Sequence, residues 1–529
     1  MIREMGKRGC LIGIMITLGL PGFLSGCSVQ GDSEPLVTLS PESAVVTLGT
    51  TKQFALATGE TTATWSVNNV GGGNSSVGTI SSDGLYKAPP LSAIDTTEVP
   101  ENVTIKGIDT SGSSGSATAF LTTFKANTRL TQYTVGAFRA NTYSAGEKGI
   151  AVYKDGSGST NVYAVWADDS QGAPDIPQIW FTKSNDGGTT FGPPIAVDED
   201  LFAKQISPVI AVDGSGNVFV VWEDYREGDA DIFIKKYDSS GFGLSYKVNS
   251  DFGVSVDYDS TPSIAVDSLG TIYVVWEHKD DSFDNYPDIY FATSNTQGQT
   301  FSTPASVAST NGRRSSVAID SLGVAYVVWE DLTGYPIQSA THIKIGKIVS
   351  GAVSGTPIQI DSPSSSYDHA RFPSVAVGPG GSVYVVWQRA LILNPGFSGE
   401  IVSTYDLDLA RVDDDGATLS YNTTSSFPHD PYVGFFGGPS YPTITGDSSN
   451  IYVAWDDQRN GTKDIYFARS SNGATFTTNR IVNDSTGTWH EKPSIAVSEG
   501  EAFVIWTDYR NTSTVTTISP NDVFFAREK

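Results

Sequence analysis

The sequence predicts an all-β protein whose larger part consists of seven similar units. The string VVWED and its variants place a tryptophan every 51 to 68 residues. These tryptophans are Trp166, Trp222, Trp276, Trp329, Trp387, Trp455 and Trp506. Such a steady spacing indicates one supersecondary unit repeated in tandem. Short segments with two-residue alternation surround each tryptophan, such as PSIAVD (Pro262–Asp267) and DIYFA (Asp288–Ala292), and this period is typical of strands.

Seven four-stranded units in one chain favour a seven-bladed β-propeller, because a radial arrangement leaves only short, protected sheet edges. We place this propeller at residues 124–529. The last repeat stops at DVFFAREK, with no residues left for a fourth strand. We therefore expect a strand at 130–138, which precedes the first repeat, to complete the last blade and close the ring.

The first 26 residues are predicted to be an export signal. Arg3, Lys7 and Arg8 precede an apolar run that is too short to span a membrane. The string Leu-Ser-Gly-Cys ending at Cys27 resembles the bacterial lipobox. This resemblance implies cleavage before Cys27, lipid attachment to that cysteine, and sorting to the outer membrane or cell surface. The alternative is an ordinary secreted protein.

Residues 27–35 form a polar linker, and residues 36–123 are predicted to form a separate domain. Its short alternating segments, turn residues and single central tryptophan, Trp65, favour an immunoglobulin-type β-sandwich. The string GTISSDGLYKAPP (Gly78–Pro90) resembles bacterial immunoglobulin-like domains. That resemblance implies a spacer or adhesive module.

Charge excludes one class of partner. The formal net charge is −25, and no basic run interrupts the acidic surface. Binding to nucleic acid requires clustered lysine and arginine to neutralise phosphates. We therefore expect no nucleic-acid partner, and contact with a membrane only through the N-terminal lipid.

A second motif, SNDGGTTF, joins the third and fourth strands of the first repeat. It resembles the Asp box of sialidase-like (BNR-repeat) propellers at five positions, which are Ser184, Asp186, Gly188, Thr190 and Phe191. Weaker copies begin at Ser294, Val412 and Ser470. The resemblance implies a structural turn that lies away from the ligand-binding face.

If the Asp boxes lie on one face, the loops between second and third strands and those entering first strands lie on the other. The candidate ligand-face residues placed there are Asp224, Arg226, Arg313, Arg314, Arg371, Asp457, Arg459, Asp508 and Arg510. His369, His490, Glu491 and Lys492 also precede first strands. Clusters of ionisable residues in such a place are candidates for a functional site.

The recurrent Trp-x-Asp-x-Arg motif has two interpretations. Because it appears in three repeats, each arginine is expected to pair with the aspartate that begins the next strand, as Arg226 would with Asp231. Alternatively, the arginines converge on the central funnel and bind a carboxylate, as the resemblance to sialidases implies. The Arg-Ile-Pro string of that family has only Arg371-Phe372-Pro373 as a counterpart, in the fifth repeat.

No metal or cofactor is expected. The five histidines have no paired ligand spacing, and the mature chain would hold no cysteine besides Cys27. Asp-rich loops offer oxygen ligands for calcium, but none matches the twelve-residue calcium loop.

Two functions remain open on the sequence alone. The first is a surface lipoprotein whose propeller binds an extracellular glycan or protein on the funnel face. The second is an exported sialidase-like glycoside hydrolase, although no catalytic residue can be named because acidic residues are abundant. The absence of an assignable acid and nucleophile favours the first.

Overall fold

The structure is a computed structural model that describes residues 37–529 except 61, 94–98, 132–139, 142–147, 170–175, 201, 250–257, 281–285, 309–310, 333–339, 363–367, 394–400, 415–418, 425–438 and 512–520. Cys27 and the linker lie outside the described residues. The described part is all-β apart from two short 3-10 turns, η1 (Leu91–Ala93) and η2 (Pro379–Gly381). Among these residues, no helix has the length and apolar character to cross a membrane.

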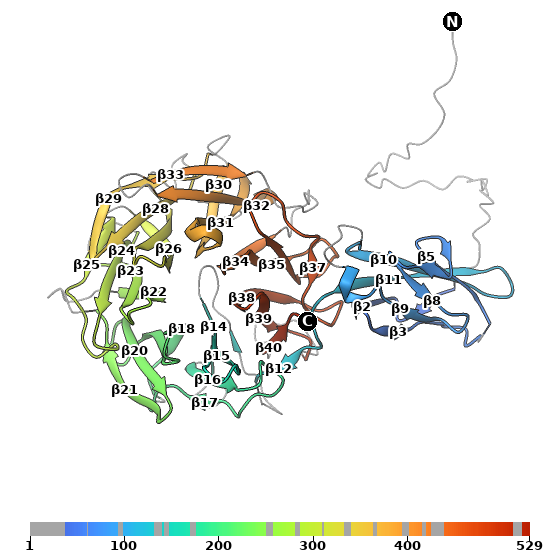
Figure 1. Ribbon diagram of the computed structural model, residues 1–529, viewed down its shortest axis with the longest axis horizontal. Helices are drawn as coiled ribbons and strands as arrows, with labels where there is room; N and C mark the ends of the chain where they lie inside the picture. Colours follow the sequence, from blue (N-terminus) through green and yellow to red (C-terminus); the bar gives the residue numbers. More distant parts are fainter. Residues whose placement is uncertain are drawn as a thin grey trace, which may run out of the picture.

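The first part of the chain forms two main sheets and a two-stranded pair that share one core (Figure 1). The larger sheet has the order β2 (Ser43–Thr47), β11 (Ser114–Thr122), β10 (Asn102–Ile108), β5 (Thr64–Val67), β6 (Val70–Gly71). The second has the order β3 (Thr51–Gln53), β9 (Leu85–Lys87), β8 (Gly78–Ile80), β7 (Gly73–Asn74), and β1 (Leu39–Ser40) pairs with β4 (Ala55–Leu56). Trp65 is 7% exposed in the shared core, so this part is a β-sandwich built around that indole.

The rest of the chain forms a ring of sheets around a central opening, which is the arrangement of a β-propeller (Figure 1). Within the described residues there are seven such sheets, which we number in chain order. Sheets 1 to 3 contain β13 (Ala140–Asn141), β14 (Ile150–Lys154), β15 (Thr160–Asp168), β16 (Gln178–Ser184), β17 (Ile195–Ala196); β18 (Gln205–Val212), β19 (Val218–Asp224), β20 (Asp231–Asp238), β21 (Gly241–Lys247); and β22 (Tyr258–Val266), β23 (Ile272–Lys279), β24 (Asp288–Ser294), β25 (Ala305–Ala308).

Sheets 4 to 6 repeat the four-stranded antiparallel order. They contain β26 (Gly312–Ile319), β27 (Ala325–Asp331), β28 (His342–Val349), β29 (Ala352–Gln359); β30 (Asp368–Val377), β31 (Val383–Leu393), β32 (Ile401–Asp414), β33 (Leu419–Thr424); and β34 (Ser440–Gly446), β35 (Ile451–Asp457), β36 (Asp464–Ser470), β37 (Arg480–Ile481). Sheet 7 contains β38 (His490–Ser498), β39 (Glu501–Asp508), β40 (Asp522–Arg527) and β12 (Thr128–Arg129).

The ring closes through β12, a segment that precedes sheet 1 and pairs with the last strand of the chain. Thr128 and Arg129 lie opposite Phe525 and Phe524 of β40, and the Leu130 amide donates to the Val523 carbonyl at 2.8 Å. The observed pairing thus begins two residues before the predicted strand at 130–138, of which residues 132–138 lie outside the described residues.

Each tryptophan packs in the junction between its own sheet and the preceding one. Trp222, for example, shares a buried cluster with residues of β15 and β16, and Trp166 shares one with residues of β39 and β40. The clusters in the described residues number seven, one for each neighbouring pair of sheets, including the pair 7 and 1. An open row of seven sheets has six junctions, so these contacts are those of a closed ring.

Serine hydroxyls add polar ties between neighbouring innermost strands. Ser494 Oγ of sheet 7 accepts the Gly149 amide of sheet 1 at 2.9 Å. The same contact joins sheets 3 and 4, 4 and 5, and 5 and 6, through Ser263, Ser316 and Ser374, at 3.2 to 3.4 Å. Because each serine accepts an amide that no strand partner uses, these bonds satisfy backbone donors at the ring's inner wall.

Candidate functional site

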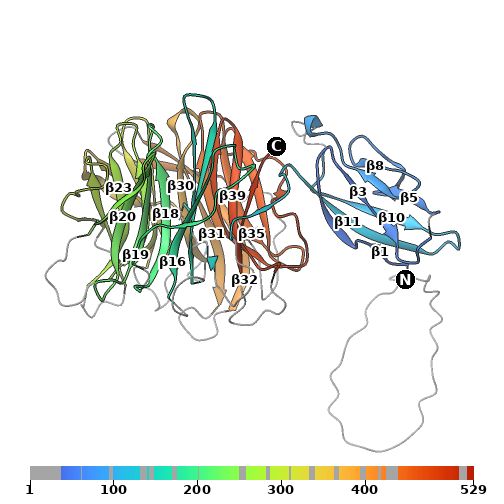
Figure 2. The same cartoon turned by 90° about the horizontal axis from the view of Figure 1, so that it is seen from below.

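The antiparallel sheets give the ring two distinct faces. The turns between first and second strands share a face with those between third and fourth strands, as the 2.8 Å bond from the Gly187 amide to the Thr160 carbonyl confirms. We call this the Asp-box face. The strand ends that lead from second to third strands, and those at which first strands begin, lie on the opposite face, which we call the mouth face. Figure 2 shows the ring from the side, with the two faces at its upper and lower edges.

The first Asp box is a closed turn, as its sequence resemblance implies. Ser184 Oγ accepts the Gly188 amide at 2.8 Å, and Asp186 accepts the amide and hydroxyl of Thr190 at 2.9 and 2.7 Å. Burial raises the pKa of Asp186, but the bonds from Ser184 and Thr190 outweigh it and bring the value to about 2. Gly188 has φ of +80°, and an added Cβ would lie 2.3 Å from Phe525, so only glycine fits there.

The Trp-x-Asp-x-Arg motif forms the same set of internal bonds in all three of its sheets. In sheet 2, Asp224 is fully buried and accepts Trp222 Nε1 at 2.7 Å, the Arg226 amide at 2.9 Å and the guanidinium at 2.5 Å. Asp457 with Arg459, and Asp508 with Arg510, repeat these bonds. Each guanidinium also lies over an aromatic ring of the third strand, at 4.0 to 4.3 Å.

The expected partner of these arginines is wrong, although a pairing role is observed. Arg226 reaches Asp198, which follows the fourth strand of sheet 1, at 3.3 Å, whereas Asp231 pairs with Lys247 at 2.9 Å. Arg510 likewise reaches Asp484 at 2.6 Å. Since the loop after a fourth strand passes to the next sheet, the arginine joins two sheets where the sequence suggested a bond within one.

A second set of residues occupies one equivalent position in six innermost strands. Each stands at a β-bulge one residue before a proline (or before Ser315) and has a positive φ between 47° and 57°. These residues are Ser207, Thr261, Arg314, Phe372, Tyr441 and Lys492. A positive φ is uncommon for residues other than glycine and is found where surrounding structure enforces it, often at functional sites. The backbone repeats around the ring while the side chain changes.

Three of these side chains form a continuous series across sheets 4, 5 and 6. The Arg314 guanidinium lies 4.2 Å from the centre of the Phe372 ring, and the Phe372 and Tyr441 ring centres are 4.6 Å apart. Lys463 Nζ follows at 5.5 Å from the Tyr441 ring and 5.9 Å from that of Trp489, which is 40% exposed. We call these five residues the mouth wall.

At the arginine end of the mouth wall, the guanidinium groups pair with Glu330 beneath them. This carboxylate is fully buried and accepts Arg313 at 2.6 Å and Arg314 at 2.7 Å. Burial would raise the pKa of Glu330, but Arg314 and Arg313, with Arg371 nearby, hold it below its usual range. The predicted residues Arg313, Arg314 and Arg371 therefore converge on one carboxylate.

The lysine end contains two carboxylates that share one amine. Lys463 Nζ lies 3.1 Å from Asp456 and 3.8 Å from Glu491, which in turn accepts the Tyr509 hydroxyl at 2.9 Å. Burial raises the pKa of Asp456, and the charge of Lys463 opposes that rise. Of these four residues, sequence reasoning had selected Glu491 alone.

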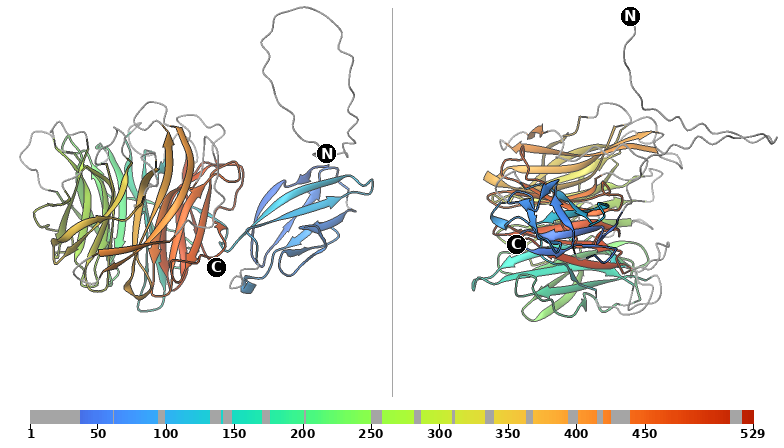
Figure 3. Two further views of the ribbon diagram at one scale, coloured as in Figure 1. Left: turned by 90° about the horizontal axis from the view of Figure 1, so that it is seen from above. Right: turned by 90° about the vertical axis from the view of Figure 1, so that its right-hand side faces the viewer.

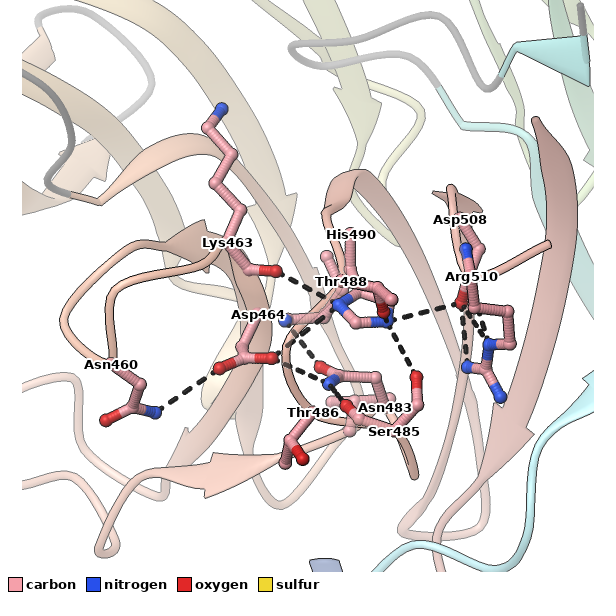
Figure 4. A network of polar contacts seen from close by, with 12 residues as sticks. Asn460, Lys463, Asp464, Asn483, Ser485, Thr486, Thr488, His490, Asp508 and Arg510 are labelled. Atoms are coloured by element: carbon pink, nitrogen blue, oxygen red, sulfur yellow. Dashed lines mark hydrogen bonds and ion pairs between the residues drawn. The ribbon is translucent and has the colours of Figure 1, made fainter. Parts of the chain in front are cut away.

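His490 is a buried residue that links sheets 6 and 7 (Figure 4). The ring is fully buried, with Nδ1 donating to the Lys463 carbonyl at 3.0 Å and Nε2 at 2.9 Å from Ser485 Oγ. His369 is also fully buried and accepts the Thr341 amide at 3.1 Å. In the described part of the chain, no group of three or more potential ligands is placed to hold a metal ion.

Sequence reasoning missed Phe372, Tyr441, Lys463 and Trp489. A usable signal was present for the first two, because the residue before the Pro-Ser or Pro-Thr of the first strand varies while its neighbours repeat. Lys463 and Trp489 occupy positions that do not repeat among the sheets. Their place beside Tyr441 depends on the packing of two sheets.

Comparisons with known proteins identify fold-level likeness only. No family model matches this sequence, and no curated protein sequence matches it. Among solved structures, it is similar to an ulvan lyase of polysaccharide lyase family PL25 bound to -[GlcA(1-4)Rha3S]-, with 11% identity, 72% of this chain and 94% of that chain covered, and a TM-score of 0.47. The Penicillium chrysogenum α-L-arabinanase complexed with arabinobiose has 11% identity, 61% and 92% coverage, and a TM-score of 0.40.

The GH93 α-L-arabinofuranosidase of Fusarium graminearum, in complex with arabinobiose, has 9% identity, 77% and 98% coverage, and a TM-score of 0.42. No residue role is transferred from these proteins to this chain.

Proposed function

We propose that this chain is an exported lipoprotein, with an immunoglobulin-like domain and a seven-bladed propeller, that binds an extracellular glycan at the mouth wall. The series Arg314, Phe372 and Tyr441 carries the proposal. Aromatic rings offer flat apolar contact, while guanidinium and ammonium groups fix the orientation of a polar ligand through hydrogen bonds. A few convergent polar groups beside aromatic residues are typical of small-ligand sites.

A protein ligand is the second form of this binding function. Partly exposed aromatic and arginine side chains are also enriched at protein interfaces. The mouth wall favours a glycan, because its aromatic rings follow the inner rim of a ring-shaped opening, where a narrow chain fits better than a folded domain.

The binding test uses alanine at the two central rings. Phe372→Ala and Tyr441→Ala are each expected to weaken binding to a polysaccharide that the wild type binds, at least tenfold, because each removes one aromatic ring of the mouth wall. Affinity electrophoresis against a panel of soluble acidic and neutral polysaccharides measures this. Leu322→Ala, an 87% exposed residue on the Asp-box face, is the matched control. Unchanged binding by both mouth variants would refute the proposal.

Glycoside hydrolysis is an alternative with one specific observation in its favour. Asp456 and Glu491 share Lys463, and burial raises the pKa of Asp456. A pair of carboxyl groups in unlike environments is what acid-base hydrolysis of a glycosidic bond requires. Turnover of fluorogenic glycosides that is lost in both Asp456→Asn and Glu491→Gln would establish this activity in place of simple binding.

The lipid anchor and surface location are part of the proposal and rest on the lipobox resemblance at Cys27. Replacement by Cys27→Ser should move the protein from the membrane fraction to the soluble fraction of the producing cells. If the wild type and Cys27→Ser divide equally between the membrane and soluble fractions, the lipid anchor is wrong. The proposed binding at the mouth wall is not affected by that result.

A further inference from the structure

Lys148 lies two residues before β14, the innermost strand of sheet 1, at a position that other sheets fill with uncharged residues. Gly149 accepts the Val165 amide at 2.9 Å, which aligns Lys148 with the residue that follows each positive-φ position. The equivalents in the other sheets are Pro208, Pro262, Ser315, Pro373, Pro442 and Pro493. These residues form a ring immediately below the mouth, and Lys148 is its single cation.

The Lys148 side chain extends across the central opening. Its Nζ donates to the Val317 carbonyl at 3.3 Å, and Val317 lies on β26 of sheet 4. Sheets 1 and 4 lie on different sides of the opening, where β14 and β26 are innermost (Figure 1). The amine therefore closes the lower end of the mouth.

No described side chain balances the charge of this amine. Burial alone lowers the pKa of Lys148 to about 8, and no carboxylate among the described residues contributes to it. The bond that the described residues give this amine is the one to the Val317 carbonyl, which carries no net charge. Three other lysines that are buried or partly buried in the ring do have such partners: Lys235 with Glu199, Lys347 with Asp414 and Lys463 with Asp456. Burying a cation without a counter-charge is costly.

We propose that Lys148 forms the floor of the mouth and binds an anionic group, a carboxylate or a sulfate, of a sugar held by the mouth wall. The inference deepens the proposed glycan binding and rests on it, because it names the ligand class as an acidic glycan. Val317 follows Arg314 by three residues on β26, about 10 Å along the strand. Glu330 already pairs with Arg313 and Arg314, whereas no carboxylate of the described residues pairs with Lys148, which leaves this amine available to an incoming anion.

The experiment compares the whole chain with Lys148→Met, a variant of similar length and volume. The probes are oligogalacturonate for carboxylates, oligomers of dextran sulfate for sulfates, and maltohexaose as a neutral sugar. Titration calorimetry at pH 8.5, in two buffers with different ionisation enthalpies, reports the affinity and the protons taken up. The matched control is Lys154→Met, which changes an exposed lysine at the end of β14.

The wild type is expected to bind at least one acidic oligomer with proton uptake, since an anion beside the amine favours its charged form. Lys148→Met should weaken that binding at least tenfold and abolish the proton uptake, while its affinity for the neutral sugar stays unchanged. The Lys154→Met protein should behave as the wild type. Which acidic oligomer responds separates a carboxylate from a sulfate ligand.

Stability gives a second, ligand-free readout. Lys148→Met should keep or raise the melting temperature of the free protein at pH 7, because it removes a desolvated amine. At equal ionic strength set with chloride, inorganic sulfate should raise that temperature more in the wild type than in the variant, because sulfate also stabilises folded proteins in general. A lower melting temperature in Lys148→Met without sulfate would mark a structural lysine and overturn the inference.

The two proposals fail in different ways. Acidic and neutral sugars could bind equally well, with binding that is lost in Tyr441→Ala and unchanged in Lys148→Met. In that case the role of Lys148 is wrong and the proposed glycan binding stands. If no sugar binds but sulfate stabilises the wild type more than Lys148→Met, the amine is an anion site and the proposed glycan function is wrong. If no sugar binds and sulfate stabilises the wild type and Lys148→Met equally, the proposed glycan binding and the role of Lys148 are both wrong.

Discussion

At the scale of single residues, buried aspartates organise the protein more than exposed charges do. Asp224 and its counterparts Asp457 and Asp508 each serve a tryptophan indole, a backbone amide and a guanidinium. Such an acceptor cannot be removed without leaving buried donors unsatisfied, which costs more than the bond itself contributes. The sheet junction and the mouth-face loop thus depend on one carboxylate.

Asp224→Asn should lower the free energy of unfolding by about 3 kcal/mol, because it breaks a buried pair and leaves Arg226 with Asp198 alone. Urea unfolding at pH 7 measures this. Asp413→Asn, in a pair with Arg411 whose members are 57% and 47% exposed, should cost less than about 1 kcal/mol. Equal losses in the two variants would contradict the role of burial.

The Asp box should make stability depend on pH. The pKa of Asp186 is about 2 in the folded protein against an ordinary 3.8, so its stabilisation is present above about pH 4 and is lost as the pH falls toward 2. Asp186→Asn should therefore destabilise the protein at pH 7 and lose that difference on acidification. Thermal melts from pH 7 to pH 3 test this, with the exposed Glu42→Gln as control. A difference independent of pH would contradict it.

At the scale of elements, the short strand β12 has an effect larger than its two residues suggest. Its pairing with β40 brings Leu130, which is 2% exposed, into the cluster that joins sheets 7 and 1. Arg129 and Thr131 both contact Asp522, at 2.6 and 2.5 Å. The ring is therefore held shut by a main-chain pairing, an apolar contact and an ionic contact at one place.

Leu130→Ala should lower the free energy of unfolding by about 3 kcal/mol, because it opens a cavity at the closing junction. Chemical denaturation gives the number, and Leu322→Ala, which is 87% exposed, should change it by less than about 0.5 kcal/mol. A loss near that of the control would mean that the junction does not depend on this strand.

Sequence periodicity was sufficient for the strands, the tryptophan positions and the two faces, because these follow from local pattern. The partners of Arg226 and Arg510 were not predictable in the same way, since Asp198 and Asp484 belong to the preceding sheet. The mouth wall was missed for a related reason. Its five residues come from three sheets and from loops, and only packing brings Arg314 to Phe372 and Lys463 to Tyr441.

At the scale of the whole molecule, the sandwich lies beside the ring (Figure 3), and specific polar contacts join the two. Arg480 of β37 is 5% exposed and donates to the carbonyls of Pro100 and Val99 at 2.7 and 3.0 Å. Glu101 pairs with Arg459 at 3.5 Å, and burial raises the pKa of Glu101. A mouth-face arginine predicted for ligand binding thus contacts the N-terminal domain.

Arg480→Met should uncouple the two parts, because the carbonyls of Val99 and Pro100 lose their donor while staying buried. Scanning calorimetry is expected to resolve two transitions in the variant and one in the wild type. Lys52→Met, on an exposed strand of the sandwich, should behave as the wild type. One shared transition in Arg480→Met would show that other contacts suffice.

The chain enters the sandwich beside the mouth face, since Ser43, near the start of β2, contacts Thr486 of the loop that leads to His490, at 2.9 Å. Nine residues separate Cys27 from Val37, a reach of about 30 Å when fully extended. If Cys27 carries the proposed lipid, a tether of that length, attached on that side, would turn the opening toward the surface that carries it. The protein would then sample polymers rooted in its own envelope before those arriving from the surrounding medium.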